Sequence, residues 1–227
     1  MSRKGNSRHV KRLAASQYAG AKRKEAAYLA KPTPGRHTLE QNATLLSIIR
    51  DMLHIANTEK EAELPVRAGS FKVNGRIVKD IKYPIGYGDV IQILPLGKFY
   101  GIGINKQGKI TVKEVKEAQG RTAKIIGKYV AKGKKIMLRL NDGTVVGFEK
   151  PANVNDSVRI SLDNKIDGIL KLQEGARCEV FKGAHAAETG TITGLTNGTA
   201  QISAKARIKS SSGTFETLVE NIIVTGE

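Results

Sequence analysis

The segment from Gly69 to Ile93 contains two tight turns, each next to a short run of alternating residues. The first turn is Asn74-Gly75. This dipeptide between alternating residues is a strong signal for a two-residue hairpin of type I′, in which both central residues have positive φ. The second turn, Gly88-Asp89, precedes the run Val90–Ile93. The pattern therefore predicts a small sheet, and the cations along it are Lys72, Arg76, Lys79 and Lys82.

Positive charge dominates the chain and is concentrated at its N-terminus. The 227 residues include 38 Lys and Arg against 21 Asp and Glu, which gives a formal charge of +17. Residues 1–37 hold ten of these cations and one acid, Glu25, and so carry a charge of +9. We expect such a segment to stay extended until a polyanion neutralises it, in a salt-dependent interaction that releases counterions. A basic tail that serves only solubility is the alternative.

Two short helices are expected between the basic segment and the hairpin. Lys31-Pro-Thr-Pro-Gly35 reads as a rigid linker, because its prolines block helix formation. Apolar residues then recur at helical spacing, which predicts a helix over about Leu39–Ala56. Thr58 and Glu61 form the pattern of a capping box, in which each side chain accepts a hydrogen bond from the other residue's amide. A second helix should therefore run from Glu59 to about Arg67.

The remainder of the chain is predicted to be β-structure. Apolar residues occur in short runs, so several small cores are favoured over one large core. Turns that precede alternating strands recur throughout, as in small barrels. The strands expected are Ile110–Val115, Ala123–Val130, Ile136–Leu140, Val145–Phe148, Cys178–Phe181, Thr189–Gly194, Thr199–Ala204 and Glu216–Val224.

Several classes of function find no support in the sequence. One cysteine, Cys178, and four widely spaced histidines do not form a zinc-binding pattern. Phosphate-binding loops, dinucleotide fingerprints and catalytic motifs are equally lacking. We therefore expect no metal, no cofactor, no small-molecule substrate and no enzymatic activity. No apolar run has transmembrane length, and the basic N-terminus lacks the apolar region of a secretory signal. A mitochondrial-type transit peptide is a weaker alternative for that segment.

Cations of the predicted helices and hairpin favour nucleic acid as the anionic partner. On the first helix, Arg50 and His54 are i, i+4 neighbours on the polar face. Aromatic residues make up only 5% of the chain, so stacking of bases on exposed rings is not supported. Contacts with phosphates and 2′-hydroxyls of structured RNA fit better. The further candidates on these elements are Lys60, Arg67, Lys72, Arg76 and Lys79.

These elements resemble a known RNA-binding module. A helix, the Thr58 cap, a second helix, Gly69-x-x-x-Val73-Asn74-Gly75-Arg76 and Gly88-Asp89-Val90-Ile91 follow one another. This order resembles the alpha-L domain of bacterial ribosomal protein S-four and of several RNA-modifying enzymes. The resemblance implies that the helix pair and the hairpin grip structured RNA.

Motifs along nearly the whole chain resemble the archaeal and eukaryotic small-subunit ribosomal protein family S-four-e (S4e). They are His9-Val-Lys-Arg-Leu-Ala-Ala15, Pro32-Thr-Pro-Gly35-x-His37, Tyr83-Pro84-x-Gly86, Val154-Asn155-Asp156 and Asn221-Ile222-x-Val224-x-Gly226. The resemblance implies a multi-domain α+β fold. Its parts would be a basic extended N-terminal arm (1–37), an alpha-L RNA-binding domain (38–94), a central β-barrel-like domain (95–172) and a C-terminal SH3-like KOW barrel (173–227).

The KOW motif of this resemblance is Gly175–Leu195, with Gly183 and Gly190 as its turn glycines. Glu188 is acidic in that loop, where a contact with RNA favours a basic residue. The chain ends soon after its last predicted strand, without the basic extension of eukaryotic members, which favours an archaeal member.

The function implied is that of a non-enzymatic structural constituent of the small ribosomal subunit, cytoplasmic and ribosome-bound. Its partners would be small-subunit rRNA and neighbouring ribosomal proteins. An accessory of RNA-modifying enzymes and a KOW-type transcription or translation factor are the alternatives. In the arm, the residues expected to contact RNA are Arg3, Lys4, Arg8, His9, Lys11, Arg12, Lys22, Arg23 and Arg36.

Overall fold

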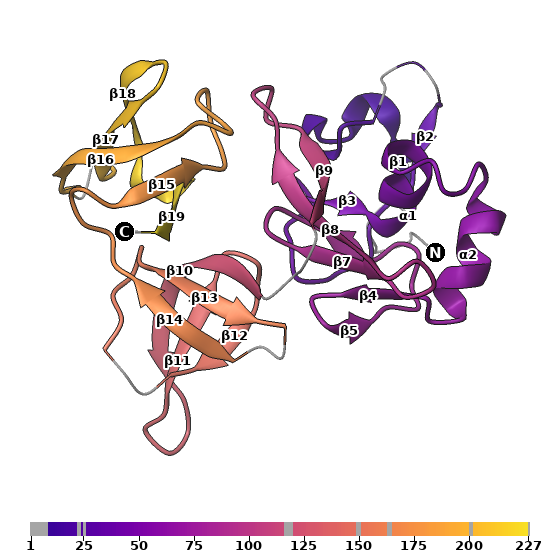
Figure 1. The fold of residues 1–227 in the computed structure, drawn as a ribbon, viewed down its shortest axis with the longest axis horizontal. Helices are drawn as coiled ribbons and strands as arrows, with labels where there is room; N and C mark the ends of the chain where they lie inside the picture. Colours follow the sequence, from indigo (N-terminus) through magenta and orange to yellow (C-terminus); the bar gives the residue numbers. More distant parts are fainter. Residues whose placement is uncertain are drawn as a thin grey trace, which may run out of the picture.

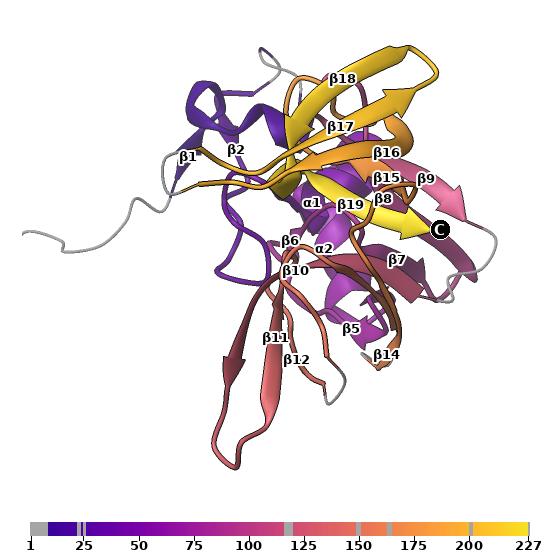
Figure 2. The ribbon, with the colours of Figure 1, turned by 90° about the vertical axis from the view of Figure 1, so that its left-hand side faces the viewer.

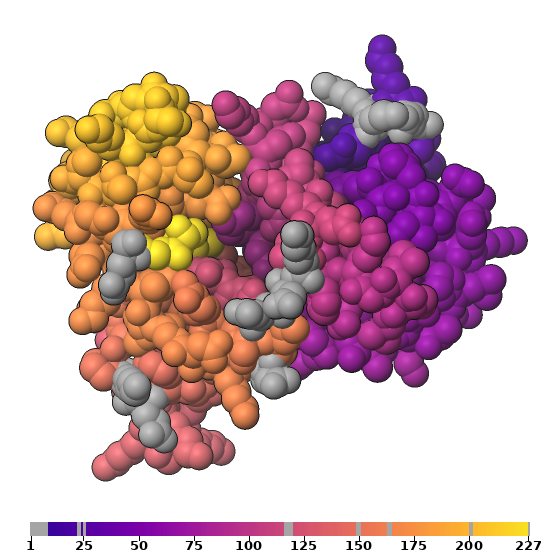
Figure 3. All heavy atoms as spheres, viewed as in Figure 1, coloured from indigo at the N-terminus to yellow at the C-terminus, as the bar shows by residue number. Residues whose placement is uncertain are grey.

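The chain forms three units, each with its own sheet and its own apolar core (Figure 1). The structure is a computed structural model that describes residues 9–21, 24, 26–115, 120–148, 151–162, 165–199 and 202–226. Figure 3 shows the first unit, in indigo to magenta, beside the central and C-terminal units, in salmon to yellow. Over the described ranges, no helix is long and apolar enough to cross a membrane.

The described part of the basic N-terminal segment folds onto the first unit. Val10–Lys11 (β1) pairs antiparallel with Tyr28–Leu29 (β2), and 3-10 helices at Arg12–Ala14 and Gln17–Ala19 follow β1. Ala19 is 4% exposed and belongs to the first core. The expectation that residues 1–37 stay extended is therefore wrong for the described ones, because Ala19 is buried in the first core and Tyr18 and Leu29 pack against it.

The first predicted helix is shorter than its sequence pattern. Ala43–Thr44 (β3) is a strand that pairs with Pro84–Ile85 (β6), and the α1 helix, Leu45–Ser47, begins only after it. The hydroxyl of Thr44 caps α1 by accepting from the amide of Ser47 at 3.3 Å. A π-helical stretch, Ile48–Met52, follows. The helix predicted over 39–56 is too long at both ends, because the pairing of β3 keeps the preceding chain extended and the positive φ of 52° at His54 departs from a helical path.

The second predicted helix is confirmed. Helix α2 spans Glu59–Arg67, and the hydroxyl of Thr58 accepts from the amide of Glu61 at 3.2 Å. The Glu61 carboxylate accepts from the amide of Asn57 at 2.9 Å, one residue before the amide that we expected. Each bond satisfies an amide at the helix start that has no partner within the helix, which stabilises this end.

The predicted hairpin is confirmed in the first sheet. Phe71–Val73 (β4) pairs with Arg76–Ile77 (β5), and φ is 49° at Asn74 and 80° at Gly75, as a type I′ turn requires. Strand β4 also pairs with Val90–Ile93 (β7). The sheet has the order β5-β4-β7-β8-β9, where the last two strands are Lys98–Ile104 (β8) and Ile110–Val115 (β9). This sheet therefore continues past residue 94, where the sequence predicted the end of the first domain.

The central unit is built on one long strand that two neighbours share. Gly120–Val130 (β10) pairs through its first half with Ser157–Ser161 (β13) and through its second half with Ile136–Leu140 (β11). The sheet order β12-β11-β10-β13-β14 is completed by Val145–Gly147 (β12) and Ile166–Leu170 (β14). The register with β11 shifts next to Ile126, so this residue forms a β-bulge that bends the strand. Apart from their ends, the strands predicted here are confirmed.

The C-terminal unit has the sheet order β18-β17-β16-β15-β19. Its strands are Arg177–Val180 (β15), Thr189–Thr196 (β16), Lys205–Ser210 (β17), Gly213–Leu218 (β18) and Ile222–Gly226 (β19). Figure 2 shows this sheet above the central unit.

Two strand predictions in the C-terminal unit are wrong. In the strand expected at Thr199–Ala204, residues 200–201 lie outside the described ones and the others form no strand. The strand β17 forms instead, because Ala206 and Ile208 supply the buried alternation while Ile202 is 60% exposed. The single strand expected at Glu216–Val224 is interrupted by a 3-10 turn at Val219–Asn221. The turn is needed because β18 and β19 lie at opposite edges of the sheet.

Candidate nucleic-acid interface

The predicted RNA-binding residues of the N-terminal segment are described only in part. His9 and Lys11 are exposed, and the ring of His9 lies 5.7 Å from that of Tyr28, centroid to centroid. Arg12 is only 9% exposed. This end of the first unit thus presents Lys11 to solvent and buries Arg12. The candidates that lie outside the described residues are Arg3, Lys4, Arg8, Lys22 and Arg23.

The helical candidates differ in how freely they face solvent. Lys60, on α2, is exposed. Arg67, at the end of α2, is also exposed and pairs with Glu63 one turn earlier, with Nη2 and Oε1 2.6 Å apart. Arg50 lies in the π-helical stretch and binds Asp51 through two nitrogens, at 2.6 and 3.1 Å. Lys60 and Arg67 are therefore the more accessible cations of the helical region.

The hairpin candidates do not share one face. Lys72 lies opposite Ile77 in the β4–β5 pair, whereas Arg76 lies opposite the buried Val73. Residues directly opposite each other in an antiparallel pair point to the same side, so Lys72 and Arg76 point to opposite sides. Arg76 is nevertheless exposed, because it stands at the end of the hairpin, and Lys79 in the following loop is exposed as well.

The turn of this hairpin contacts the central unit. A Cβ at Gly75 would stand 2.6 Å from the carbonyl oxygen of Leu162, in the turn after β13. The side chain of Asn74 is buried and bonds to the start of β7: it donates to Asp89 Oδ1 at 2.6 Å and accepts from the amide of Val90 at 2.9 Å. The turn that the sequence predicted as part of an RNA-binding hairpin therefore lies in a contact between units.

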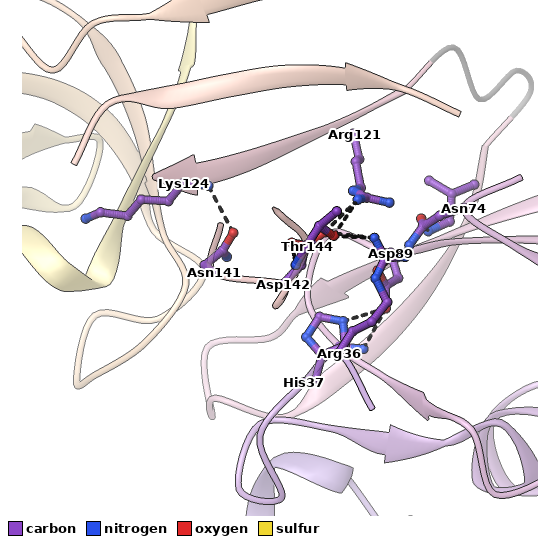
Figure 4. A network of polar contacts seen from close by, with 11 residues as sticks. Arg36, His37, Asn74, Asp89, Arg121, Lys124, Asn141, Asp142 and Thr144 are labelled. Carbon is purple, nitrogen blue, oxygen red and sulfur yellow. Dashed lines mark hydrogen bonds and ion pairs between the residues drawn. The ribbon is translucent and has the colours of Figure 1, made fainter. Parts of the chain in front are cut away.

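Asp89 is the centre of a buried polar network (Figure 4). Its Oδ2 lies 2.7 Å from Nε2 of His37 and accepts from the amide of Gly86 at 3.0 Å. Burial raises the pKa of Asp89, but the charge of His37 and the donors from Gly86 and Asn74 outweigh it and bring that pKa to about 2. Asp89 is therefore a charged group that joins the linker before β3 to the start of β7.

A second network joins the same linker to the central unit. Asp142 accepts from two guanidinium groups, that of Arg121 at 2.7 Å and that of Arg36 at 3.3 Å, and both arginines also donate to the hydroxyl of Thr144. That hydroxyl in turn donates to Asp142 at 2.7 Å. Burial lowers the pKa of Arg121, against the pull of Asp142. Arg36, a predicted RNA-binding residue, thus has its guanidinium engaged inside the protein.

The turn that holds Asp142 requires glycine. Gly143 has φ of 76°, and a Cβ there would collide with the backbone carbonyl of Arg36. A side chain at this position would therefore separate the linker from the central unit.

The central and C-terminal units are joined by buried polar groups as well. Lys124, on β10, is 2% exposed, and its ammonium donates to the carbonyls of Val219 and Ile222. Burial lowers the pKa of Lys124 to about 8, although Glu220 opposes this shift. The hydroxyl of Ser157 accepts from the amide of Val224 at 2.9 Å.

The first and C-terminal units also touch. The rings of Tyr87 and Phe181 stack with centroids 5.7 Å apart and an angle of 20° between their planes. Each unit therefore contacts both others, so the exposed cations stand on one connected body.

Sequence patterns did not reveal these joints. Arg121, Asp142 and Lys124 bind partners that lie up to 23, 106 and 98 residues away, and none of the three lies in a local motif that signals burial. The family resemblance places Pro32-Thr-Pro-Gly35-x-His37 before Gly88-Asp89 in the chain. This order does not indicate which side chains pair with each other. Among the described residues, no group of three or more His, Cys, Asp or Glu could hold a metal ion.

Comparison with known proteins identifies the family. The model of ribosomal family S4e matches residues 96–166. The small ribosomal subunit protein eS4 of Archaeoglobus fulgidus is 36% identical over 185 residues, which cover 81% of this chain and 78% of the relative. The eS4 protein of Methanocella arvoryzae is 30% identical over 220 residues, covering 96% and 94% of the two chains.

A solved structure is similar to the whole arrangement. The crystal structure of the 30S ribosomal protein S4e from Thermoplasma acidophilum superimposes with a TM-score of 0.70 at 31% sequence identity. The match covers 82% of this chain and 96% of that one. The mostly β, multi-unit fold is therefore shared as well as the sequence, and the chain belongs to the ribosomal family S4e.

Proposed function

We propose that this protein is a non-catalytic structural constituent of the small ribosomal subunit. It binds rRNA through its basic N-terminal segment and through cations of helix α2 and the β4–β5 hairpin. The observation that carries this proposal is the match to archaeal eS4 proteins over most of both chains. The family is one of ribosomal proteins and not of enzymes.

Exposed cations of the first unit support a contact with phosphates. Lys60, Arg76 and Lys79 are exposed, and Arg67 makes only a surface ion pair with Glu63. A surface pair contributes about 0–1 kcal/mol, so Arg67 can exchange Glu63 for a phosphate at little cost. Lys72 faces the other side of the hairpin and would serve a separate contact. Binding led by such point charges weakens steeply with salt.

We further propose that the first unit is an alpha-L RNA-binding module and the C-terminal unit an SH3-like KOW barrel. Helix α2, the β4–β5 hairpin and β7 support the first assignment, with β8 and β9 extending the module to residue 115. In the C-terminal unit, Glu188 accepts from the hydroxyl of Ser212 at 3.0 Å and lies 3.5 Å from Nδ1 of His185. Glu188 is thereby held by its own unit, which supports a structural role for it rather than a contact with RNA.

Sedimentation and salt-dependent binding test the function. The tagged chain should sediment with small subunits at physiological salt. The purified chain should bind transcribed small-subunit rRNA of Thermoplasma acidophilum with an affinity that falls steeply as salt rises. Recovery with RNA polymerase in place of small subunits would contradict the proposed function. An affinity that is equal in low and high salt would contradict the phosphate-led contact.

A further inference from the structure

The hairpin formed by β10 and β11 extends beyond the body of the molecule. It projects away from the other sheets in Figure 2, and its tip lies at the lower end of the central unit in Figure 3. We name residues 126–139 the finger. At its tip, the amide of Ala131 donates to the carbonyl of Lys135 at 2.8 Å, which closes the loop Lys132-Gly133-Lys134. None of the cations predicted from the sequence to bind RNA lies on this element.

Positive charge is concentrated at the tip of the finger. Lys132, Lys134 and Lys135 are all exposed. No Asp or Glu occurs between Arg121 and Asn141, so the finger has no acidic residue that could neutralise them. Three ammonium groups within four residues repel one another, and the binding of a polyanion relieves this repulsion.

An exposed ring and an exposed guanidinium share one face of the finger. Tyr129 lies opposite Met137, and Gly127 lies opposite Arg139, so these four residues point to the same side. Tyr129 is 50% exposed. The Arg139 guanidinium lies across Gly127, with Nη2 3.7 Å from the place where a Cβ would stand. Because Gly127 has no side chain, the Arg139 guanidinium has room on the same face as the ring of Tyr129, and both groups can stack on a base.

The base of the finger is anchored to the central unit. The first half of β10 pairs with β13, and the ammonium of Lys128 donates to the carbonyl of Ala152 at 3.4 Å. The bulge at Ile126 fixes the bend between the two halves of β10. The direction of the finger is therefore set by the fold.

We infer that the finger is a second RNA-binding site, separate from the surface around α2 and the β4–β5 hairpin. Its tip lysines contact phosphates, and Tyr129 with Arg139 stacks on an unpaired base or on a base at the end of a helix. Charge decides the occupant, because a purely cationic tip above a stacking face matches the phosphates and bases of RNA. The inference rests on the proposed function, since it assumes that rRNA is the partner.

Neutralising the tip tests the phosphate contact. Gln replaces Lys132, Lys134 and Lys135 in the full chain, and the matched control carries Gln at the exposed Lys171, Lys205 and Lys209, with the same change of net charge. Binding to transcribed small-subunit rRNA of Thermoplasma acidophilum is measured over a salt series. The finger variant should bind on the order of 10- to 100-fold more weakly, with a salt dependence shallower by about two to three ion equivalents. Equal losses in both variants would overturn the inference.

Directed cleavage of the RNA gives a measurement that does not depend on affinity. The only cysteine, Cys178, is 1% exposed, so an iron chelate attaches selectively to an introduced cysteine. A chelate at Lys132→Cys should cut the rRNA at a few defined nucleotides, whereas one at Lys171→Cys should not cut those nucleotides. No cleavage from position 132 in a chain that still binds would overturn the finger site alone. A chain that does not bind rRNA at all would overturn the proposed function with it.

Stacking is tested separately on the same face. Tyr129→Phe should keep the affinity within about twofold, while Tyr129→Ser should lower it by roughly 5-fold or more, since stacking on an aromatic ring contributes about 1–3 kcal/mol per base. Equal affinity of the Phe and Ser variants would remove Tyr129 from the site.

Discussion

One buried carboxylate, Asp89, holds together three stretches of chain that are distant in sequence. It faces His37 from the linker, Asn74 from the hairpin turn and the amide of Gly86 from its own turn. These partners hold its pKa at about 2 despite its burial. The folded state therefore favours the charged form of Asp89 more strongly than the unfolded state does.

Replacing Asp89 with Asn should lower the free energy of unfolding by about 3 kcal/mol, because loss of one member of a buried pair leaves the other uncompensated. The pKa of Asp89 rises from about 2 in the folded chain to an ordinary 3.8 on unfolding. Its contribution is therefore complete above pH 3.8 and is lost as the pH falls towards 2. Urea unfolding at several pH values measures both effects. Asp167→Asn, at an exposed position on β14, is the control, and an equal loss there would contradict the role of Asp89.

A second prediction at the scale of single residues concerns the charge of Arg76. Arg76→Gln should weaken binding to small-subunit rRNA and make its salt dependence shallower by about one ion equivalent. Arg76→Glu should weaken it further, because a repulsive charge replaces an attractive one. Filter binding at several salt concentrations separates the two variants. Arg177→Glu, exposed on β15, carries the same charge change, and affinities that fall equally at both positions would remove Arg76 from the interface.

At the scale of elements, local sequence patterns correctly predicted the structures that local hydrogen bonds and dihedral angles stabilise. Thr58 and Glu61 placed the start of α2 correctly, and Asn74-Gly75 placed the type I′ turn, since each pattern closes its own hydrogen bonds or sets its own dihedral angles. The first helix was predicted wrongly because β3 pairs with β6, about 40 residues later, and no local pattern encodes that pairing. The strand predicted at Thr199–Ala204 was misplaced, because burial of side chains decides which of two neighbouring apolar runs forms the strand, and here it is β17.

Alanine at Gly75 and at Gly97 separates backbone strain from the contact between units. Both glycines have positive φ, 80° and 62°, but a Cβ at Gly97 meets nothing within 4 Å, while at Gly75 it meets the carbonyl of Leu162. Gly97→Ala should lower the free energy of unfolding by about 1 kcal/mol. Gly75→Ala should cost about 2–3 kcal/mol more, as expected where a close contact must open. Chemical denaturation measures the difference, and equal costs would show that the turn does not need its contact with Leu162.

At the scale of the whole molecule, the sequence predicted which cations bind RNA but not which of them bind carboxylates inside the protein. Exposed Lys60, Arg67 and Arg76 are where a surface role needs them. Arg36 looked the same in sequence, yet it binds Asp142, because a guanidinium follows whichever anion the fold brings near. Composition and motif order predicted the kind of protein. The joints between units arise from contacts between distant residues, which periodicity does not record.

Lys124 makes the free energy of unfolding vary with pH in the alkaline range. Its pKa is about 8 in the folded chain and 10.5 in the unfolded one, so the unfolded state binds the proton more tightly between these values. The free energy of unfolding of the wild type, relative to Lys124→Met, should therefore rise by about 2–3 kcal/mol as the pH increases from 8 to 10.5. Thermal and urea unfolding at pH 7.5, 9 and 10 measure it. A difference that stays constant would show that Lys124 is not desolvated at the joint, and Lys171→Met serves as the exposed control.

The link from Arg36 and Arg121 to Asp142 has a consequence for how long the protein stays on its partner. The link joins the unit that carries the α2–hairpin surface to the unit that carries the finger. When one surface releases the RNA, the other keeps it nearby, at an effective concentration set by geometry and not by the amount of protein in solution. Complete dissociation then requires both surfaces to release together. An ion pair at the contact between two units would thus govern the residence time of the protein on the ribosome.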